Sequence, residues 1–118
     1  MESKYLDLEQ RTEKFSLAVR DLCLRCKKDV INTVYIKQLI RAAGSVGANY
    51  IEANDSLGNK DKKMKIRISK KEAKESLYWL KHLLIYEDQN LEEVRTVLLS
   101  EASQLMLIFA AVLRKLSD

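Results

Sequence analysis

The feature that most constrains the fold is a helical repeat of apolar residues between positions 36 and 57. Apolar side chains recur there every seven residues, and a second set fills the offset positions. Together these are Ile36, Leu39, Ala43, Val46, Tyr50, Ala53 and Leu57. Such spacing gives a long helix one apolar face. The chain has no proline and only three glycines, which disfavours a many-stranded β fold. We therefore predict an all-α protein.

Small residues lie in the middle of this predicted helix, at Gly44, Ser45, Gly47 and Ala48. A glycine inside a helix costs about 1 kcal/mol relative to alanine, so keeping two of them indicates a packing reason. We predict that another helix packs closely against this segment.

Apolar periodicity divides the chain into four helices. We predict them at approximately residues 5–28, 34–57, 61–87 and 91–116. Helices of this length joined by short turns favour antiparallel neighbours. The prediction is an antiparallel up-down-up-down four-helix bundle that forms a single domain over residues 1–118.

Residues that favour helix ends support these boundaries. Asn32 or Thr33 is predicted to cap the second helix. Gly58 is predicted to end that helix in the left-handed region. Asn90 with Glu93 resembles a capping box at the start of the fourth helix.

The predicted fourth helix carries two apolar stripes, whereas a surface helix of a monomeric bundle needs one. The first stripe consists of Leu91, Val94, Leu98, Leu105, Ile108 and Val112. The second consists of Leu99, Ala102, Met106, Phe109, Leu113 and Leu116. We predict that the second stripe faces another subunit of a homo-oligomer. The predicted interface residues are Leu99, Met106, Phe109 and Leu113. The alternative is that this helix lies deeper in a monomeric core.

Positive charge is concentrated in the first half of the predicted third helix. Residues 60–74 carry a net charge of +6, whereas the whole chain carries +4. Spacings of three, four and seven residues place most of these cations on one helix face, where they repel each other. An anionic partner would relieve this repulsion, and RNA or DNA phosphate is the obvious candidate. The alternative is a solvated surface. We call the five predicted phosphate-binding residues the basic stripe: Lys60, Lys63, Arg67, Lys70 and Lys74.

The two cysteines, Cys23 and Cys26, form the single Cys-x-x-Cys motif of the chain. Redox use of this motif normally needs a βαβ context, and a zinc site needs two further ligands. Neither is evident in the sequence. We interpret both as buried or half-buried helical residues.

The sequence offers little support for catalysis. His82 is the only histidine, and no serine or cysteine nucleophile is matched to it by spacing. A di-iron bundle site needs Glu-x-x-His pairs on two helices, which one histidine does not supply. Three carboxylates are instead interpreted as structural or interface residues that pair with Arg41 or Lys71. They are Glu52, Glu72 and Glu75. We predict no metal, no cofactor and no enzymatic activity.

The N-terminal residues contain acidic side chains and no apolar signal-peptide core. From the sequence, we expect no apolar run to approach the roughly 18 residues of a membrane span. We predict a cytoplasmic protein that does not bind a membrane.

Five sequence motifs stand out along the chain. They are Asp7-Leu8-x-x-Arg11-Thr12-x-x-Phe15, Gln38-Leu39-x-Arg41, Ser45-Val46-Gly47-Ala48-Asn49-x-x-Glu52-Ala53, Asp61, and Lys71-Glu72-Ala73-x-Glu75-Ser76-x-Tyr78-Trp79-Leu80. Together they resemble the signature of a family of bacterial four-helix-bundle proteins. That family includes proteins encoded in intervening sequences of 23S rRNA genes, and it is similar to the accessory variability protein of diversity-generating retroelements. The chain departs from the pattern at Gly44, where a hydroxyl residue is common, and at Lys62-Lys63, where an aromatic residue is usual.

The resemblance implies an up-down bundle that assembles into a homopentamer. For the retroelement relative it also implies binding of nucleic acid through a basic surface and binding of a reverse transcriptase. Our hypothesis is a non-enzymatic oligomeric bundle that binds structured RNA or a nucleic-acid complex. The alternative is a protein-interaction scaffold without direct nucleic-acid binding, whose partner docks on the apolar stripe or on Tyr78 and Trp79.

Overall fold

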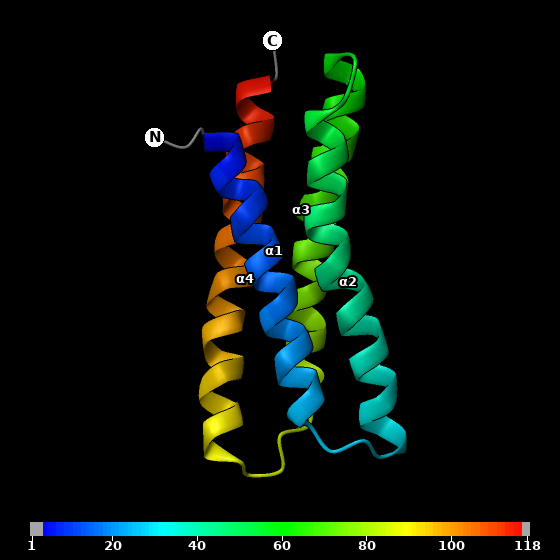
Figure 1. Ribbon diagram of the computed structural model, residues 1–118, viewed down its shortest axis with the longest axis vertical. Helices are drawn as coiled ribbons and strands as arrows, with labels where there is room; N and C mark the ends of the chain where they lie inside the picture. The colour runs from blue at the N-terminus through cyan, green and yellow to red at the C-terminus, as the bar shows by residue number, and fades with distance from the viewer. Residues whose placement is uncertain (1–3, 117–118) are drawn as a thin grey trace.

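The computed structural model describes residues 4–116, with side chains from Asp7 onward. Four helices follow each other, and no strand occurs within this range. They are α1 (Lys4–Arg25), α2 (Val30–Asn54), α3 (Asn59–His82) and α4 (Gln89–Leu116). Figure 1 shows α1 and α3 running in one direction and α2 and α4 in the other, with both ends of the chain at the same end of the bundle. The predicted all-α, up-down-up-down bundle is confirmed.

Two predicted helix starts are wrong, because aspartates cap these helices. The carboxylate of Asp29 accepts a hydrogen bond from the backbone N–H of Asn32 at 2.8 Å, so α2 begins at Val30 rather than near residue 34. The carboxylate of Asp88 accepts one from the N–H of Leu91 at 3.1 Å, so α4 begins at Gln89. Each carboxylate satisfies an orphan donor of its first helical turn.

Two predicted helix ends are also wrong. Gly58 has an extended backbone (φ −156°) and precedes α3, so it does not end α2 in the left-handed region. The third helix ends at His82 rather than near residue 87, because the connection that follows buries Leu83 and Ile85 in the core. The left-handed residues of this connection are Tyr86 (φ 55°) and Glu87 (φ 65°).

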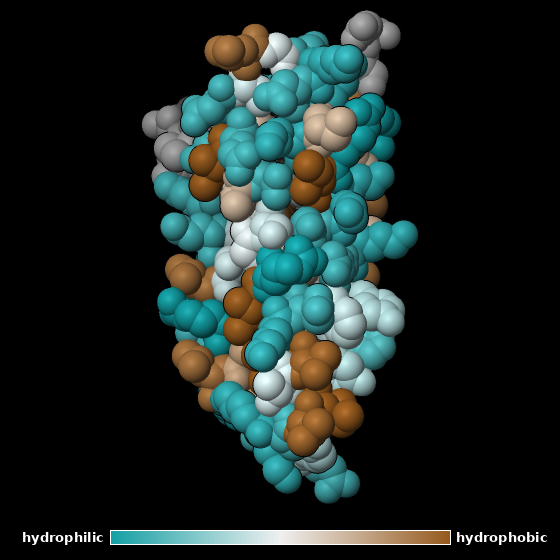
Figure 2. Space-filling model, turned by 90° about the vertical axis from the view of Figure 1, so that its right-hand side faces the viewer, coloured by the Kyte–Doolittle hydropathy of each residue, from teal (hydrophilic) through white to brown (hydrophobic). Residues whose placement is uncertain are grey.

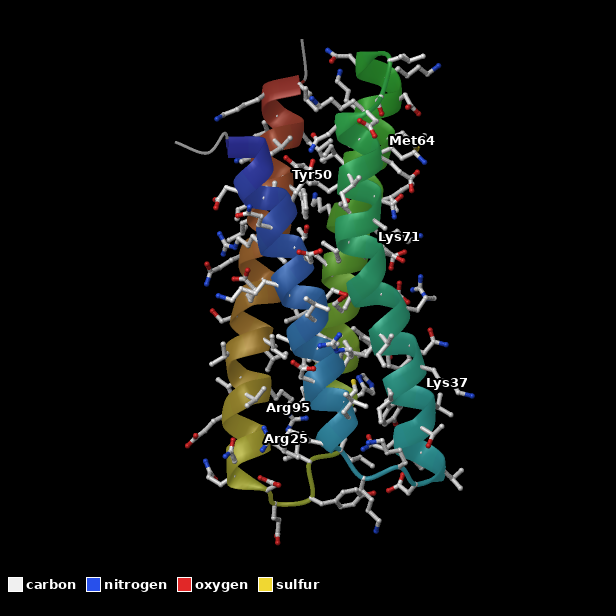
Figure 3. All side chains as sticks on the ribbon, viewed as in Figure 1. Arg25, Lys37, Tyr50, Met64, Lys71 and Arg95 are labelled. Carbon is white, nitrogen blue, oxygen red and sulfur yellow. The ribbon has the colours of Figure 1, made fainter. Side chains whose placement is uncertain are left out.

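The core runs along the bundle axis and is formed by all four helices. Tyr50 of α2 belongs to this core, points inward between the helices (Figure 3), and is 1% exposed. Its ring centroid lies 5.7 Å from that of Phe109 on α4. Ser69 donates a hydrogen bond from its buried hydroxyl to the Val46 carbonyl at 2.8 Å, which ties α3 to α2. A buried polar group paired in this way adds specificity to the packing.

Gly47 gives the packing reason predicted for the small residues. A Cβ atom added there would lie 2.9 Å from Thr12 Oγ1 and 3.2 Å from Thr12 Cβ, so α1 packs against the bare backbone of α2. Gly44 is less constrained, because its nearest such neighbour is Ser16 Oγ at 3.9 Å. The predicted close approach is therefore confirmed, and it concerns α1.

Both cysteines are buried and neither forms a disulfide, as interpreted from the sequence. Burial raises the pKa of the Cys23 thiol to about 12, and it also raises the pKa of the Cys26 thiol. Both are therefore protonated near neutral pH, and a protonated thiol is a poor nucleophile and metal ligand.

The structure corrects two sequence-based statements about α4. By length and composition, α4 is long and apolar enough to cross a membrane, although core helices of soluble proteins meet the same criterion. Its second apolar stripe is also used within the chain itself. Ala102 and Phe109 belong to the core, and the half-buried Leu99, Met106 and Leu113 pack against it. A helix packed by both α1 and α3 needs more than one apolar stripe, so the stripe alone does not require a subunit.

Candidate nucleic-acid interface

The basic stripe runs along one flank of α3, between its buried residues and its solvent-facing side. Lys60, Arg67, Lys70 and Lys74 are exposed, and Lys63 is half-buried. The buried residues of α3 are Ile66, Ser69, Glu72, Ala73, Ser76 and Leu80. This separation follows from the helical period, because positions three or four apart share a face.

Three members of the basic stripe line a groove between α3 and α4 with a volume of about 410 Å³. Arg67, Lys70 and Lys74 form one wall together with Lys71, and Met106 and Leu113 of α4 complete the lining. None of these six residues is acidic. We call this feature the α3–α4 groove. It combines four cationic side chains with an apolar wall, so it offers phosphate contacts beside a surface for a less polar group.

Lys71 is the residue of the groove that the predicted set omitted. It is exposed and lies four residues after Arg67 and three before Lys74. The i, i+4 spacing from Arg67 was visible in the sequence. Lys60 and Lys63 lie nearer the start of α3 and do not line the groove.

The groove also brings two predicted oligomer residues, Met106 and Leu113, beside the basic stripe. Leu99 is half-buried on α4 and packs against the core. Phe109 is 0% exposed, so it has no surface to offer a second subunit. Its prediction as an interface residue is corrected to a core position, whereas the other three keep some exposed surface.

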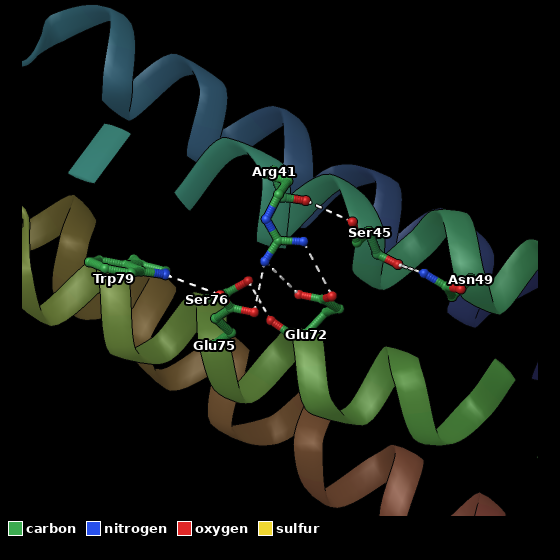
Figure 4. A network of polar contacts seen from close by, with 7 residues as sticks. All are labelled: Arg41, Ser45, Asn49, Glu72, Glu75, Ser76 and Trp79. Atoms are coloured by element: carbon green, nitrogen blue, oxygen red, sulfur yellow. Dashed lines mark hydrogen bonds and ion pairs between the residues drawn. The ribbon is translucent and has the colours of Figure 1, made fainter. Parts of the chain in front are cut away.

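The carboxylates singled out in the sequence are held by cations. Arg41 of α2 lies between two carboxylates of α3 (Figure 4). Its guanidinium donates to Glu72 at 3.2 and 3.3 Å and to Glu75 at 2.7 Å. Glu72 is 7% exposed, so this pairing stabilises a buried charge. The predicted pairing with Arg41 is confirmed, whereas Glu52 pairs with Lys65 at 2.8 Å.

These contacts leave no free carboxylate pair for acid–base chemistry in this network. Burial on its own would raise the pKa of Glu75, but hydrogen bonds from Arg41 and Trp79 hold it below its ordinary value. Within the residues that the structure describes, no cluster of three or more metal-ligating side chains occurs. The role of the network is to join α2 to α3 through the ion pairs of Arg41 with Glu72 and Glu75.

Replacing Arg41 by methionine is expected to lower the free energy of unfolding by about 1–2 kcal/mol at neutral pH. The methionine leaves buried Glu72 without its cation, and solvent screening at the half-exposed guanidinium limits the loss. Because the folded-state pKa of Glu75 is lowered, the pairing stabilises the fold above the ordinary pKa of 4.5 and is lost as pH falls through the folded pKa. The difference between the two proteins should therefore shrink in acid. Urea unfolding at several pH values measures it.

The matched control for this substitution is Arg20→Met, since Arg20 pairs with exposed Asp21 on the surface of α1. We expect it to change the unfolding free energy by less than about 0.5 kcal/mol. Equal stability of the Arg41 and Arg20 variants at pH 7 would contradict the structural role of the network.

A family comparison bears on the whole bundle. The model of the 23S rRNA-intervening sequence protein family matches residues 4–108. The chain belongs to this family. The match spans all of α1, α2 and α3 and most of α4, so it includes the basic stripe and part of the groove.

A solved relative of this 23S rRNA-intervening sequence protein has the same fold. It is the crystal structure of a protein of unknown function from the S23 ribosomal protein family of Bacteroides thetaiotaomicron. The TM-score is 0.75 at 24% sequence identity, and the similarity covers 89% of this chain and 96% of the other. The comparison with curated proteins gives no match. This structural similarity supports the four-helix-bundle fold and indicates no activity for the chain.

Proposed function

We propose that this 23S rRNA-intervening sequence protein is a non-enzymatic, cytoplasmic bundle that binds structured RNA through phosphate contacts. The observation that carries the proposal is the α3–α4 groove, in which four cations and no acidic side chain line one concave surface. Concentrating like charges on one face costs repulsion, which a bound polyanion relieves. Phosphate contacts of this kind fix the position of an RNA without reading its sequence.

We also propose that the protein acts as a homo-oligomer, with a pentamer as the arrangement implied by the family resemblance. Apolar side chains of α4 remain exposed in the single chain, with Val97 67% and Leu107 70% exposed. Leu99, Met106 and Leu113 of α4 also retain some exposed surface. Each copy would repeat the α3–α4 groove, so an oligomer would hold one RNA at several places.

The experiment is a charge reversal of the groove. The triple variant Arg67→Glu, Lys70→Glu and Lys74→Glu should bind a stem–loop RNA at least tenfold more weakly than the unchanged protein at low salt. These side chains are exposed, so the fold should persist. Fluorescence anisotropy of a labelled RNA measures the affinity, and circular dichroism verifies the helices.

The control variant carries the same change of net charge on other helices: Lys14→Glu, Arg25→Glu and Lys37→Glu. Lys14 and Arg25 lie on α1 and Lys37 lies on α2, and all three are exposed. Lys37 points away from the bundle (Figure 3). We expect a much smaller loss of affinity, due only to the overall charge. Equal losses in the two triple variants would refute a localised binding groove.

The alternative function is a protein-interaction scaffold, for example a partner of a reverse transcriptase, as the resemblance implies. The exposed apolar side chains of Val97 and Leu107 favour it, because such groups on one helix suit a protein partner. A protein that binds no RNA at any salt concentration, yet captures such an enzyme through α4, would support this alternative.

A further inference from the structure

Four aromatic rings form a cluster between α2 and α3, near the C-terminal end of α3. Tyr78 contacts Trp79 edge-on, with centroids 4.9 Å apart, and contacts the ring of His82 at 4.3 Å. Tyr35 of α2 contacts Trp79 at 5.9 Å and His82 at 5.4 Å. The sequence had placed Tyr78 and Trp79 together, but Tyr35 joins them only in the folded bundle.

Polar contacts hold these rings in place. Trp79 Nε1 donates to Glu75 Oε1 at 3.4 Å, and His82 Nδ1 lies 2.8 Å from the Tyr78 carbonyl oxygen. Glu75 is itself bound by Arg41 at 2.7 Å, which joins the rings to the network of Figure 4. The Tyr78 ring is thus supported by two neighbouring rings, so little conformational entropy is lost when another ring stacks on it.

Despite this support, Tyr78 remains 53% exposed. Figure 2 views the side formed by α2 and α3, where hydrophilic side chains predominate and apolar groups gather toward the end at which α2 begins. A ring needed only for packing would be buried further. The exposed part of Tyr78 offers a rigid aromatic surface.

Tyr78 is flanked by cations along the same helix. Lys74 precedes it by four residues and Lys81 follows it by three, and both are exposed. Residues at these spacings are neighbours on a helix surface. Lys74 also lines the α3–α4 groove, so the ring continues the line of phosphate contacts. Stacking rings bordered by cations are the recurring means of holding unpaired nucleotides.

We propose that Tyr78 is a stacking platform for one unpaired base of the bound RNA, with Lys74 and Lys81 binding the phosphates on either side. This inference rests on the proposed function and makes it more specific. The partner is an RNA helix interrupted by a bulge or loop, because a continuous duplex keeps its bases stacked inside. The cations of the groove hold the paired segment, and Tyr78 holds the base that leaves the stack.

The experiment is a cycle that combines a protein change with an RNA change. Tyr78→Ala should weaken binding of a single-nucleotide-bulge RNA roughly fivefold or more, and Tyr78→Phe should preserve it, because stacking needs the ring. Making the bulged nucleotide abasic should cost the unchanged protein a similar factor. It should cost the Tyr78→Ala variant nothing further, since the base then has no platform. Trp79, the single tryptophan, should change its fluorescence on binding the bulged RNA and much less on binding the abasic one.

Tyr86→Ala is the matched control, because Tyr86 is also 53% exposed but lies in the connection between α3 and α4. It should leave the affinity within about twofold. If the bulge RNA binds through the groove cations but Tyr78→Ala and the abasic change have no effect, the stacking platform is wrong and the phosphate-binding proposal stands. If the two losses simply multiply, Tyr78 and the bulged base act independently, and the platform is equally wrong. If neither RNA binds at low salt, both proposals fail together.

Discussion

Replacing Asn32 by leucine should lower the free energy of unfolding by about 3 kcal/mol. The Asn32 side chain is fully buried and joins the two connections at one end of the bundle. Its amide nitrogen donates to the carbonyls of Lys27 and Leu84 at 2.9 and 3.1 Å, and its oxygen accepts from the Leu84 N–H at 2.9 Å. Leucine has a similar size, so it leaves these backbone groups buried without partners, and each costs free energy.

Urea unfolding followed by circular dichroism measures this loss. Asn90→Leu is the control, because Asn90 is exposed in the first turn of α4. We expect the control to change the unfolding free energy by less than about 0.5 kcal/mol. Comparable losses in the two variants would show that the hydrogen bonds of Asn32 do not hold the connections together.

The second large effect is expected at Gly47. Alanine would add about 1 kcal/mol of helix stability at an unconstrained position. At Gly47, however, its Cβ would lie 2.9 Å from Thr12 Oγ1, so α1 must move away from α2. We expect Gly47→Ala to destabilise the protein by about 1–2 kcal/mol, because overpacking a close helix contact exceeds the gain in propensity.

Gly44→Ala is the natural comparison, because both glycines lie in the middle of α2. The nearest neighbour of a Cβ at Gly44 is 3.9 Å away, so alanine there should stabilise the protein by up to about 1 kcal/mol. Thermal unfolding of both variants gives the difference. Thr12→Ala combined with Gly47→Ala should recover part of the loss, because it removes the nearest atom. Two variants of equal stability would contradict the close helix contact.

The sequence predicted the architecture well, because apolar periodicity depends on local spacing alone. The helix ends were harder to predict. Asp29 and Asn32 are both good caps and lie three residues apart, so local chemistry does not decide between them. The choice follows from tertiary structure, because Asn32 is needed in the interior to bind Leu84, and α2 must then begin before it.

The candidate site was predictable in part for the same reason. The basic stripe lies on one helix, so its periodicity revealed it. The groove depends on how α3 and α4 are rotated against each other, which no single helix encodes. Met106 and Phe109 belong to one apolar stripe in the sequence, yet Met106 lines the groove and Phe109 is fully buried. The Tyr35–Trp79 contact likewise depends on how α2 and α3 pack.

The measurement that tests phosphate binding most directly is the mass of the protein in solution, with and without a stem–loop RNA, over a salt series. Five phosphate contacts, one for each residue of the basic stripe, predict an affinity that falls about 10²- to 10³-fold as salt rises from roughly 50 to 200 mM. We expect an oligomer that carries RNA at low salt and releases it steeply as salt rises. An oligomer or monomer whose mass is unchanged by RNA even at the lowest salt would contradict RNA binding and leave the basic stripe as solvated surface.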